Sequence, residues 1–138
     1  MKTRWLNPSY LVICCAVMIL CGLVSAQDKL PTSGTADIPF DFYVSGSKLP
    51  AGQYTLDRVV ATYVLLHSSD GKVSQDLYLL QNAAPAPNTP NQLVFALRDG
   101  KYYFAEVWSW YGKSQLTSFN AQAGDQTKVV PLKAAAQK

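Results

Sequence analysis

Apolar and polar side chains alternate along much of the chain after residue 35. In residues 36–44 every second side chain is apolar, and the side chains between them are mostly polar. A period of two indicates a half-buried strand, because successive side chains of a strand point to opposite faces. Shorter stretches of the same kind recur at 53–60, 62–68, 73–80, 92–98, 101–110 and 115–119. The sequence therefore predicts about seven short strands.

Turn-forming residues separate these stretches. Asp70-Gly71 and Asp99-Gly100 each stand between two alternating stretches, and this dipeptide is a strong signal for a hairpin. Residues 81–91 hold three prolines and show no periodicity, which predicts a loop. No amphipathic helix is evident after residue 26. We therefore expect one all-β domain at residues 36–119, a small antiparallel β-sandwich or a partly closed barrel.

The first 26 residues follow a different pattern. Lys2 and Arg4 precede an uncharged apolar stretch at 10–24, and Val24-Ser25-Ala26 ends in small residues. This three-part arrangement predicts a signal-peptide helix that is cleaved after Ala26. The alternatives are an uncleaved membrane anchor, although the apolar stretch is short for a span, and a lipid anchor on Cys21.

Two further segments lack the alternating pattern. Residues 27–35 are polar and contain Pro and Gly, so we expect a flexible leader. Residues 120–138 are mostly small or polar, so we expect a poorly ordered tail. Within the tail only residues 129–132 could pair with a strand, and Pro131 would confine that pairing to a sheet edge.

Charge and cysteine content exclude several classes of function. The chain has 12 basic and 9 acidic residues, and 10 basic residues remain without Lys2 and Arg4. The remaining basic residues are scattered, so nucleic acid is an improbable partner. All three cysteines lie within residues 1–26, and residues 27–138 therefore offer neither a disulfide nor a thiolate. After residue 24 no apolar stretch is long enough for a membrane span.

Candidate catalytic residues are few. With Asp70-Gly71 as a two-residue turn, the only histidine, His67, lies opposite Ser74 and diagonal to Asp76. The other face of this hairpin carries the large apolar side chains, so the three residues are expected on a solvated face without oxyanion donors. The chain has one glutamate and no motif typical of a nucleotide or metal enzyme. We expect no enzyme activity, no cofactor and no metal site.

The aromatic stretch FAEVWSWYG at 104–112 contains the candidate binding residues. A two-residue Asp99-Gly100 turn would place Glu106 opposite Leu93, on the face of Phe104 and Trp108 that is expected to form the core. Glu106 is therefore interpreted as a structural polar anchor paired with Arg58, a tyrosine or backbone amides; a solvated rim position and a functional carboxylate are the alternatives. Trp110 and Tyr111 follow at the strand end, where we expect them to be exposed and to form a tentative binding site.

Four motifs in this order resemble a group of short exported bacterial all-β proteins. They are IPFDF at 38–42, LPAGQY at 49–54, LVF at 93–95 and YFAEVW at 103–108. The resemblance implies export and an all-β fold, and it carries over no activity, ligand or catalytic residue. The chain departs from the group after the last strand, where LTSFNAQAG at 116–124 replaces a charged stretch.

The sequence thus predicts an exported, non-enzymatic β module in the periplasm or outside the cell. Its expected role is structural or a protein interaction, with a cell-envelope protein or a polysaccharide as the partner. The alternative is a small-ligand or carbohydrate binder that uses the aromatic residues Trp110 and Tyr111.

Overall fold

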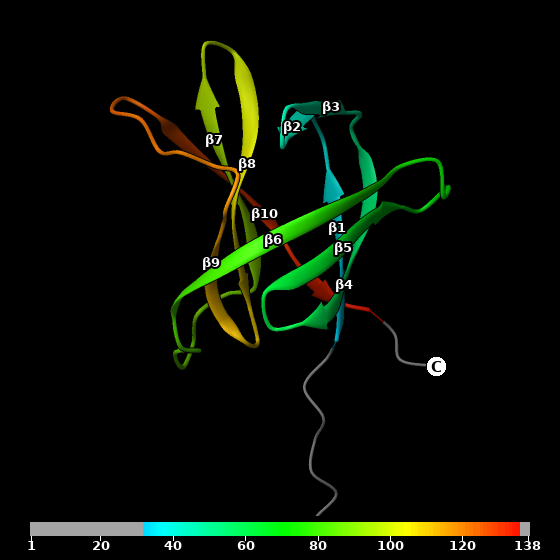
Figure 1. Cartoon of the computed structure of the whole chain (residues 1–138), viewed down its shortest axis with the longest axis vertical. Helices are drawn as coiled ribbons and strands as arrows, with labels where there is room; N and C mark the ends of the chain where they lie inside the picture. Colours follow the sequence, from blue (N-terminus) through cyan, green and yellow to red (C-terminus); the bar gives the residue numbers. More distant parts are fainter. Residues whose placement is uncertain (1–31, 136–138) are drawn as a thin grey trace, which may run out of the picture.

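The computed structural model describes residues 32–135 (Figure 1). The expected signal peptide at 1–26 and most of the expected leader lie outside these residues. Within them the fold is all-β, as predicted, with no helix. The strands are β1 (Ser33–Ile38), β2 (Phe42–Val44), β3 (Ser47–Leu49), β4 (Gly52–Val60), β5 (Tyr63–Ser68), β6 (Ser74–Ala83), β7 (Gln92–Arg98), β8 (Lys101–Ser109), β9 (Gly112–Leu116), β10 (Gln126–Pro131) and β11 (Lys133–Ala134).

The strands form one open, mixed sheet. Neighbouring strands follow the order β10-β7-β8-β9-β6-β5-β4-β1-β11, and each of these pairs is antiparallel. The small β2–β3 hairpin joins this path through a parallel pairing of β2 with β8. This pairing arises because β9 covers only the 106–109 end of β8 and leaves the 102–103 end to β2. The expectation of a purely antiparallel fold is therefore wrong, and the sheet is not a closed barrel.

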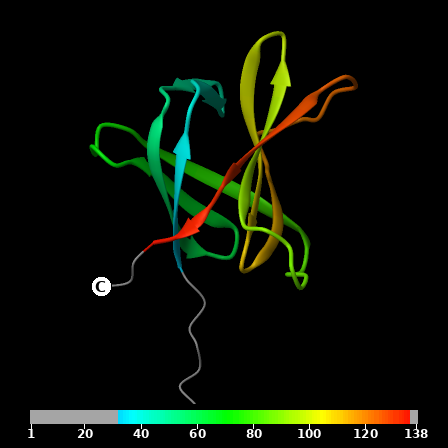
Figure 2. The same ribbon diagram turned by 180° about the vertical axis from the view of Figure 1, so that it is seen from behind.

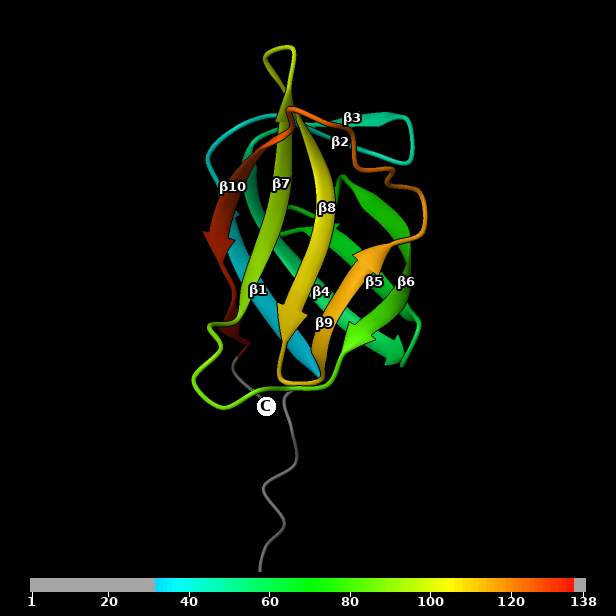
Figure 3. The same ribbon diagram turned by 90° about the vertical axis from the view of Figure 1, so that its left-hand side faces the viewer.

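Strand β6 belongs to both halves of the sheet. Its first half pairs with β5, and its second half, from Leu79, pairs with β9. Figure 3 shows β10, β7, β8 and β9 side by side, with β1, β4 and β5 behind them. Figure 2 shows how the two halves are joined at the other edge: β10 pairs with β7 in one half, and β11, which follows it, pairs with β1 in the other half. The two halves therefore face each other and enclose the core.

The core consists of the apolar side chains that the two halves turn toward each other. Its centre is Phe95, whose ring lies 5.0 Å from Phe40, 5.4 Å from Phe42 and 5.0 Å from Phe104 between ring centroids. Such aromatic contacts stabilise a core beyond the area they bury. The β5–β6 hairpin contributes the face that the sequence predicts, namely Val64, Leu66, Leu77 and Leu79.

Both ends of the described chain are more ordered than the sequence predicts. Residues 33–35 belong to β1 and not to a leader. Residues 126–134 form β10 and β11, so the expectation of a poorly ordered tail is wrong for this segment. The cause is non-local: β10 covers the edge of β7, and Val130 and Leu132 join the core. Pro131 does lie in an edge strand.

An ion pair joins β7 to the segment before β10. Nε of Arg98 donates to Oδ1 of Asp125 at 2.7 Å, and Nη2 donates to Oδ2 at 2.6 Å. The backbone amide of Gln122 also donates to this carboxylate at 2.9 Å. These hydrogen bonds lower the pKa of Asp125 to about 2, and the bonding to Arg98 is the largest cause. The pair is a side-on clamp of the kind that arginine forms best.

Acid is therefore expected to weaken the fold through Asp125. Because the pKa of this carboxyl is lower in the folded chain than its ordinary value of about 3.9, its contribution to stability is complete above about pH 5 and is lost as the pH falls toward 2. Thermal unfolding measured from pH 5 to pH 2 should show a steeper fall in Tm for the natural chain than for Asp125→Asn. If Tm fell equally steeply with pH in both proteins, Asp125 would not be the source of the loss of stability in acid.

Candidate functional site

Trp110 and Tyr111 are the two turn residues of the β8–β9 hairpin. Ser109 and Gly112 pair on either side of them, and the amide of Tyr111 donates to Oγ of Ser109 at 3.3 Å. Gly112 has a φ of +113°, in the region that favours glycine. The sequence places the last strand at 115–119, but the strand already begins at Gly112. The turn thus fixes both aromatic residues at one end of the sheet.

The position of Glu106 depends on a bulge between β7 and β8. The predicted register holds from Arg98–Lys101 to Phe95–Phe104, and it then shifts so that Val94 pairs with Glu106. Val107, in place of Glu106, faces the core. The prediction that Glu106 lies opposite Leu93 and faces the core is therefore wrong. An extra residue on one strand turns the following side chains to the opposite face.

The shift brings Glu106 and Trp108 together outside the core. Nε1 of Trp108 donates to Oε2 of Glu106 at 2.7 Å. Nζ of Lys113, on β9, lies 3.5 Å from the same oxygen and 4.8 Å from the centroid of the Trp108 ring. Glu106 is a paired polar residue, but its partners are Trp108 and Lys113 and not the expected Arg58 or a tyrosine. Trp108 is half-buried, not part of the core.

Trp108 and Trp110 line a cleft of about 400 Å³ next to the turn, which we call the indole cleft. The opposite wall is the loop at 84–91, which we call the proline loop; in Figure 3 it passes beneath the β8–β9 turn. This volume lies within the range of small-molecule sites. The aromatic and polar side chains that line the cleft are Trp108, Ser109, Trp110 and Lys113 from the hairpin and Thr89 and Asn91 from the loop.

Two contacts hold the end of β6, where the proline loop begins, against the turn, and a third fixes the other end of the loop. A Cβ on Gly112 would lie 2.2 Å from the carbonyl oxygen of Ala83, so only glycine permits this approach. Nε2 of Gln81 donates to the carbonyl oxygen of Tyr111 at 2.9 Å. At the far end of the loop, the amide of Leu132 donates to the carbonyl oxygen of Asn91 at 3.0 Å. Both ends of the loop that forms the second wall of the cleft are therefore fixed to neighbouring segments.

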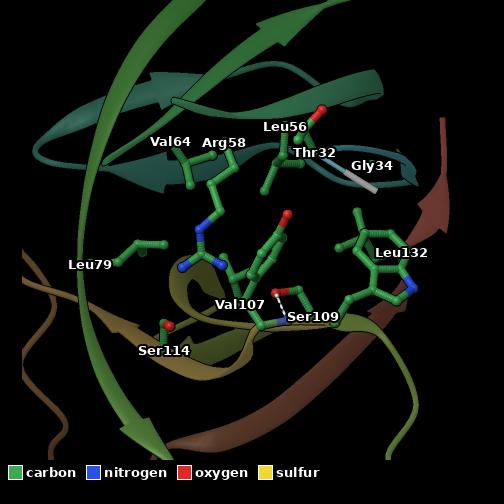
Figure 4. Close-up of a pocket in the computed structure, with 12 residues that line it drawn as sticks. Thr32, Gly34, Leu56, Arg58, Val64, Leu79, Val107, Ser109, Ser114 and Leu132 are labelled. Carbon is green, nitrogen blue, oxygen red and sulfur yellow. Dashed lines mark hydrogen bonds between the residues drawn. The ribbon is translucent and has the colours of Figure 1, made fainter. Parts of the chain in front are cut away.

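A second, smaller cavity lies between the two halves of the sheet, and we call it the Arg58 cavity (Figure 4). Its volume is about 30 Å³. The guanidinium carbon of Arg58 lies 4.2 Å from the centroid of the Tyr111 ring, and Ser109 and Trp110 line both this cavity and the indole cleft. Trp110 and Tyr111 are half-buried, and Trp110 packs against the core. They are therefore less exposed than the sequence predicts.

The candidate catalytic group is not assembled in the predicted way. His67 pairs with Ser74, as predicted. The carboxylate nearest to His67 is however Asp57, with Oδ2 3.4 Å from Nδ1, and Oγ of Ser33 donates to the same side chain. Asp76 instead accepts a hydrogen bond of 2.7 Å from the hydroxyl of Tyr63. Nδ1 of His67 has no hydrogen-bond partner, so the geometry of an aligned triad is not formed.

Sequence reasoning identifies part of this site. Trp110 and Tyr111 are at the site, but the sequence places Trp108 in the core and predicts no binding role for the proline loop or for Arg58. The combination of Gly112 after two aromatic residues was the available signal for the turn. Among residues 32–135, no group of three or more His, Cys, Asp or Glu side chains could hold a metal ion. The same residues form no helix suited to crossing a membrane.

Comparison with protein-family models, with curated proteins and with solved structures found no match to this chain.

Proposed function

We propose that this chain is an exported, non-enzymatic β module that binds a neutral carbohydrate in the indole cleft. The observation that carries the proposal is the pair of indole rings, Trp108 and Trp110, on one wall of a cleft of about 400 Å³. An indole combines a large apolar face with a polar edge. The apolar face of a pyranose ring is a suitable partner for such a face.

The polar groups of the cleft fit a hydroxyl-rich ligand. Asn91 and Thr89 on the loop and Ser109 on the turn offer both donors and acceptors. A few placed polar groups beside apolar walls are typical of sites that bind small molecules. The carbohydrate class therefore accounts for both kinds of lining residue.

Charge in the cleft favours a neutral ligand. Lys113 is the charged residue that lines it, and its ammonium group already faces the carboxylate of Glu106 at 3.5 Å. An anionic ligand would compete with Glu106 for this cation, and a cationic ligand would be repelled by it. A neutral sugar disturbs neither interaction.

Trp108 is held in place before any ligand arrives. Its ring nitrogen is bonded to Glu106, and Lys113 lies over its ring. A side chain fixed in this way loses little conformational freedom on binding, which favours affinity. Export rests on the signal pattern of residues 1–26, and it would place the cleft where cell-envelope or environmental polysaccharides occur.

Replacement of Trp108 by alanine is expected to weaken carbohydrate binding at least tenfold, because a tryptophan that a ligand covers contributes more than about 1.4 kcal/mol. Residues 27–138 contain two tryptophans, Trp108 and Trp110, and both line the cleft. Titration of residues 27–138 with a panel of neutral oligosaccharides, followed by tryptophan fluorescence, therefore reports on the site directly. Tyr78→Ala, which removes a 59% exposed ring on β6, is the matched control.

A protein-interaction role is the second candidate. It is favoured by a row of apolar side chains across the outer face of β4, β5 and β6, where Val60 pairs with Tyr63 and Tyr63 with Tyr78. Tyr78 and its neighbour Leu80 are exposed. No fluorescence change with any sugar, together with retention of an envelope protein that Tyr78→Ala abolishes and Trp108→Ala does not, would replace the carbohydrate proposal by this one.

A further inference from the structure

Arg58 reaches from β4 into the space between the two halves of the sheet (Figure 4). Its Nη2 donates to the carbonyl oxygen of Ala61 at 2.6 Å, and its guanidinium lies over the ring of Tyr111. Leu56, Val64 and Leu79 surround the side chain with apolar atoms. A permanently charged group thus lines a largely apolar cavity.

The hydrogen-bonding capacity of Arg58 is incompletely used. Its Nε is buried and has no hydrogen-bond partner. The ion pairs formed among residues 32–135 do not include Arg58. Arg98 provides the comparison within the same chain, because it holds Asp125 through both Nε and Nη2. Arg58 has the same pair of nitrogens, but its Nε makes no hydrogen bond and its Nη2 donates to a backbone carbonyl and not to a carboxylate.

This arrangement is costly without a further partner. A buried donor that makes no hydrogen bond loses its hydration without compensation, and a cation in apolar surroundings loses more. Burial lowers the pKa of Arg58, and the nearby Tyr111 opposes this only in part. An anion beside the guanidinium would compensate both costs.

The dimensions of the Arg58 cavity select the size of that anion. A volume of about 30 Å³ exceeds the roughly 10–15 Å³ that one water molecule requires, and it accommodates about two oxygen atoms. Ser109, Ser114 and Thr32 line the same cavity, and a serine or threonine hydroxyl can donate to an oxygen. Two oxygens side by side, facing a planar fork of N–H groups, are the shape of a carboxylate.

We propose that the Arg58 cavity is a binding site for a carboxylate group, held side-on by Nε and Nη2 of Arg58 as Asp125 is held by Arg98. The carboxylate comes either from a small free acid or from the end of a larger molecule such as an acidic sugar. The second source is geometrically reasonable because Ser109 and Trp110 line both the cavity and the indole cleft. The site does not depend on carbohydrate binding in the cleft.

The test uses the Nε–H resonances of arginine. Residues 27–138 contain only Arg58 and Arg98, so ¹⁵N-labelled protein that lacks the expected signal peptide, and with it Arg4, gives two such signals, and Arg98 serves as the internal control. The chain is titrated with sodium acetate and, separately, with sodium galacturonate, each against sodium chloride at equal ionic strength. We expect a saturable shift of the Arg58 signal with the carboxylates, and an unchanged Arg98 signal.

The two titrations also distinguish the sources. Similar affinities indicate a site for small free acids, whereas binding of galacturonate at least tenfold tighter than acetate indicates a larger acidic ligand; both results support the site. An Arg58 signal that does not move, that moves equally with chloride, or that moves together with Arg98 would overturn the proposal. Trp108→Ala should leave the acetate titration unchanged, which separates this site from the carbohydrate proposal.

Variants of Arg58 provide a second measurement. At about ten times its Kd, a carboxylate should raise the Tm of the natural chain by about 5 °C. Arg58→Lys keeps the charge and removes the planar fork, so we expect it to lose most of this rise. A full rise in Arg58→Lys would show that charge alone is sufficient and would contradict a side-on carboxylate. If this variant does not fold, the resonances of the natural chain still decide the question.

Discussion

Gly112→Ala is expected to lower the free energy of unfolding by about 4 kcal/mol, a loss near the upper limit for single substitutions. Two costs combine at this residue. A φ of +113° is unfavourable for any residue with a Cβ, and the new Cβ would lie 2.2 Å from the carbonyl oxygen of Ala83. The atom in the way is backbone, so no side-chain rotation can relieve the contact. Urea unfolding followed by circular dichroism measures the loss.

Gly71→Ala is the matched control for this substitution. Gly71 also has a positive φ, +74°, but an added Cβ would meet no atom within 4 Å. Its replacement should cost only about 1–2 kcal/mol, the cost of the backbone conformation alone. Equal losses in the two variants would mean that the proline loop moves away without cost, and that Gly112 does not hold the wall of the indole cleft.

Ending the chain at Asp125 is expected to lower the free energy of unfolding by about 4 kcal/mol or more, which is most of the stability of a domain at the lower end of the usual range of about 5–15 kcal/mol. The truncation deletes β10 and β11, and with them Val130 and Leu132, two buried side chains that each contribute about 1.5–3 kcal/mol. It also exposes the edge of β7, which β10 covers along six residue pairs. Loss of the near-ultraviolet circular dichroism signal would report the unfolding.

Two comparisons make this second result specific. A chain that ends at Ala135 retains both strands and should unfold like the natural chain. Within β10, Val130→Ala should cost about 2 kcal/mol and Val129→Ala almost nothing, because Val130 is 3% exposed and Val129 is 47% exposed. A truncated chain that unfolds cooperatively with an unchanged midpoint would contradict the role assigned to the last two strands.

Local patterns in the sequence predicted the local parts of the fold. The hairpins at Asp70-Gly71 and Asp99-Gly100 form with the expected register next to the turn. The inner face of the β5–β6 hairpin is also as predicted. In both cases the information lies within about ten residues, in the turn dipeptide and in the alternation of side chains.

The bulge in β8 could not be predicted in this way. The residues around it, including Ala105, carry neither glycine nor proline to mark an irregular pair. The shift occurs where β8 exchanges its neighbour β2 for β9, so its cause lies in distant segments of the chain. One extra residue was sufficient to move Glu106 and Trp108 out of the core, and this is why the sequence assigned both to the wrong face.

The C-terminal strands and the cleft were missed for a related reason. Residues 126–134 have a weak strand pattern, and they are ordered by the edge of β7 and by the core. The indole cleft requires the proline loop to pass against Gly112, which no local pattern specifies. The sequence could therefore name Trp110 and Tyr111 as aromatic residues at a strand end, but not the walls around them.

The two ends of the fold lie side by side, and this has a mechanical consequence. β1 and β11 are antiparallel, with Gly34 opposite Ala134, and the amide of Ala135 donates to the carbonyl oxygen of Ser33. A force that pulls the two ends of the fold apart would therefore act across the hydrogen bonds of this pair. The bonds would break one after another and not all together. If both ends of the fold were held and pulled apart, β11 would separate first and β10 next, while the β5–β6 hairpin stayed intact.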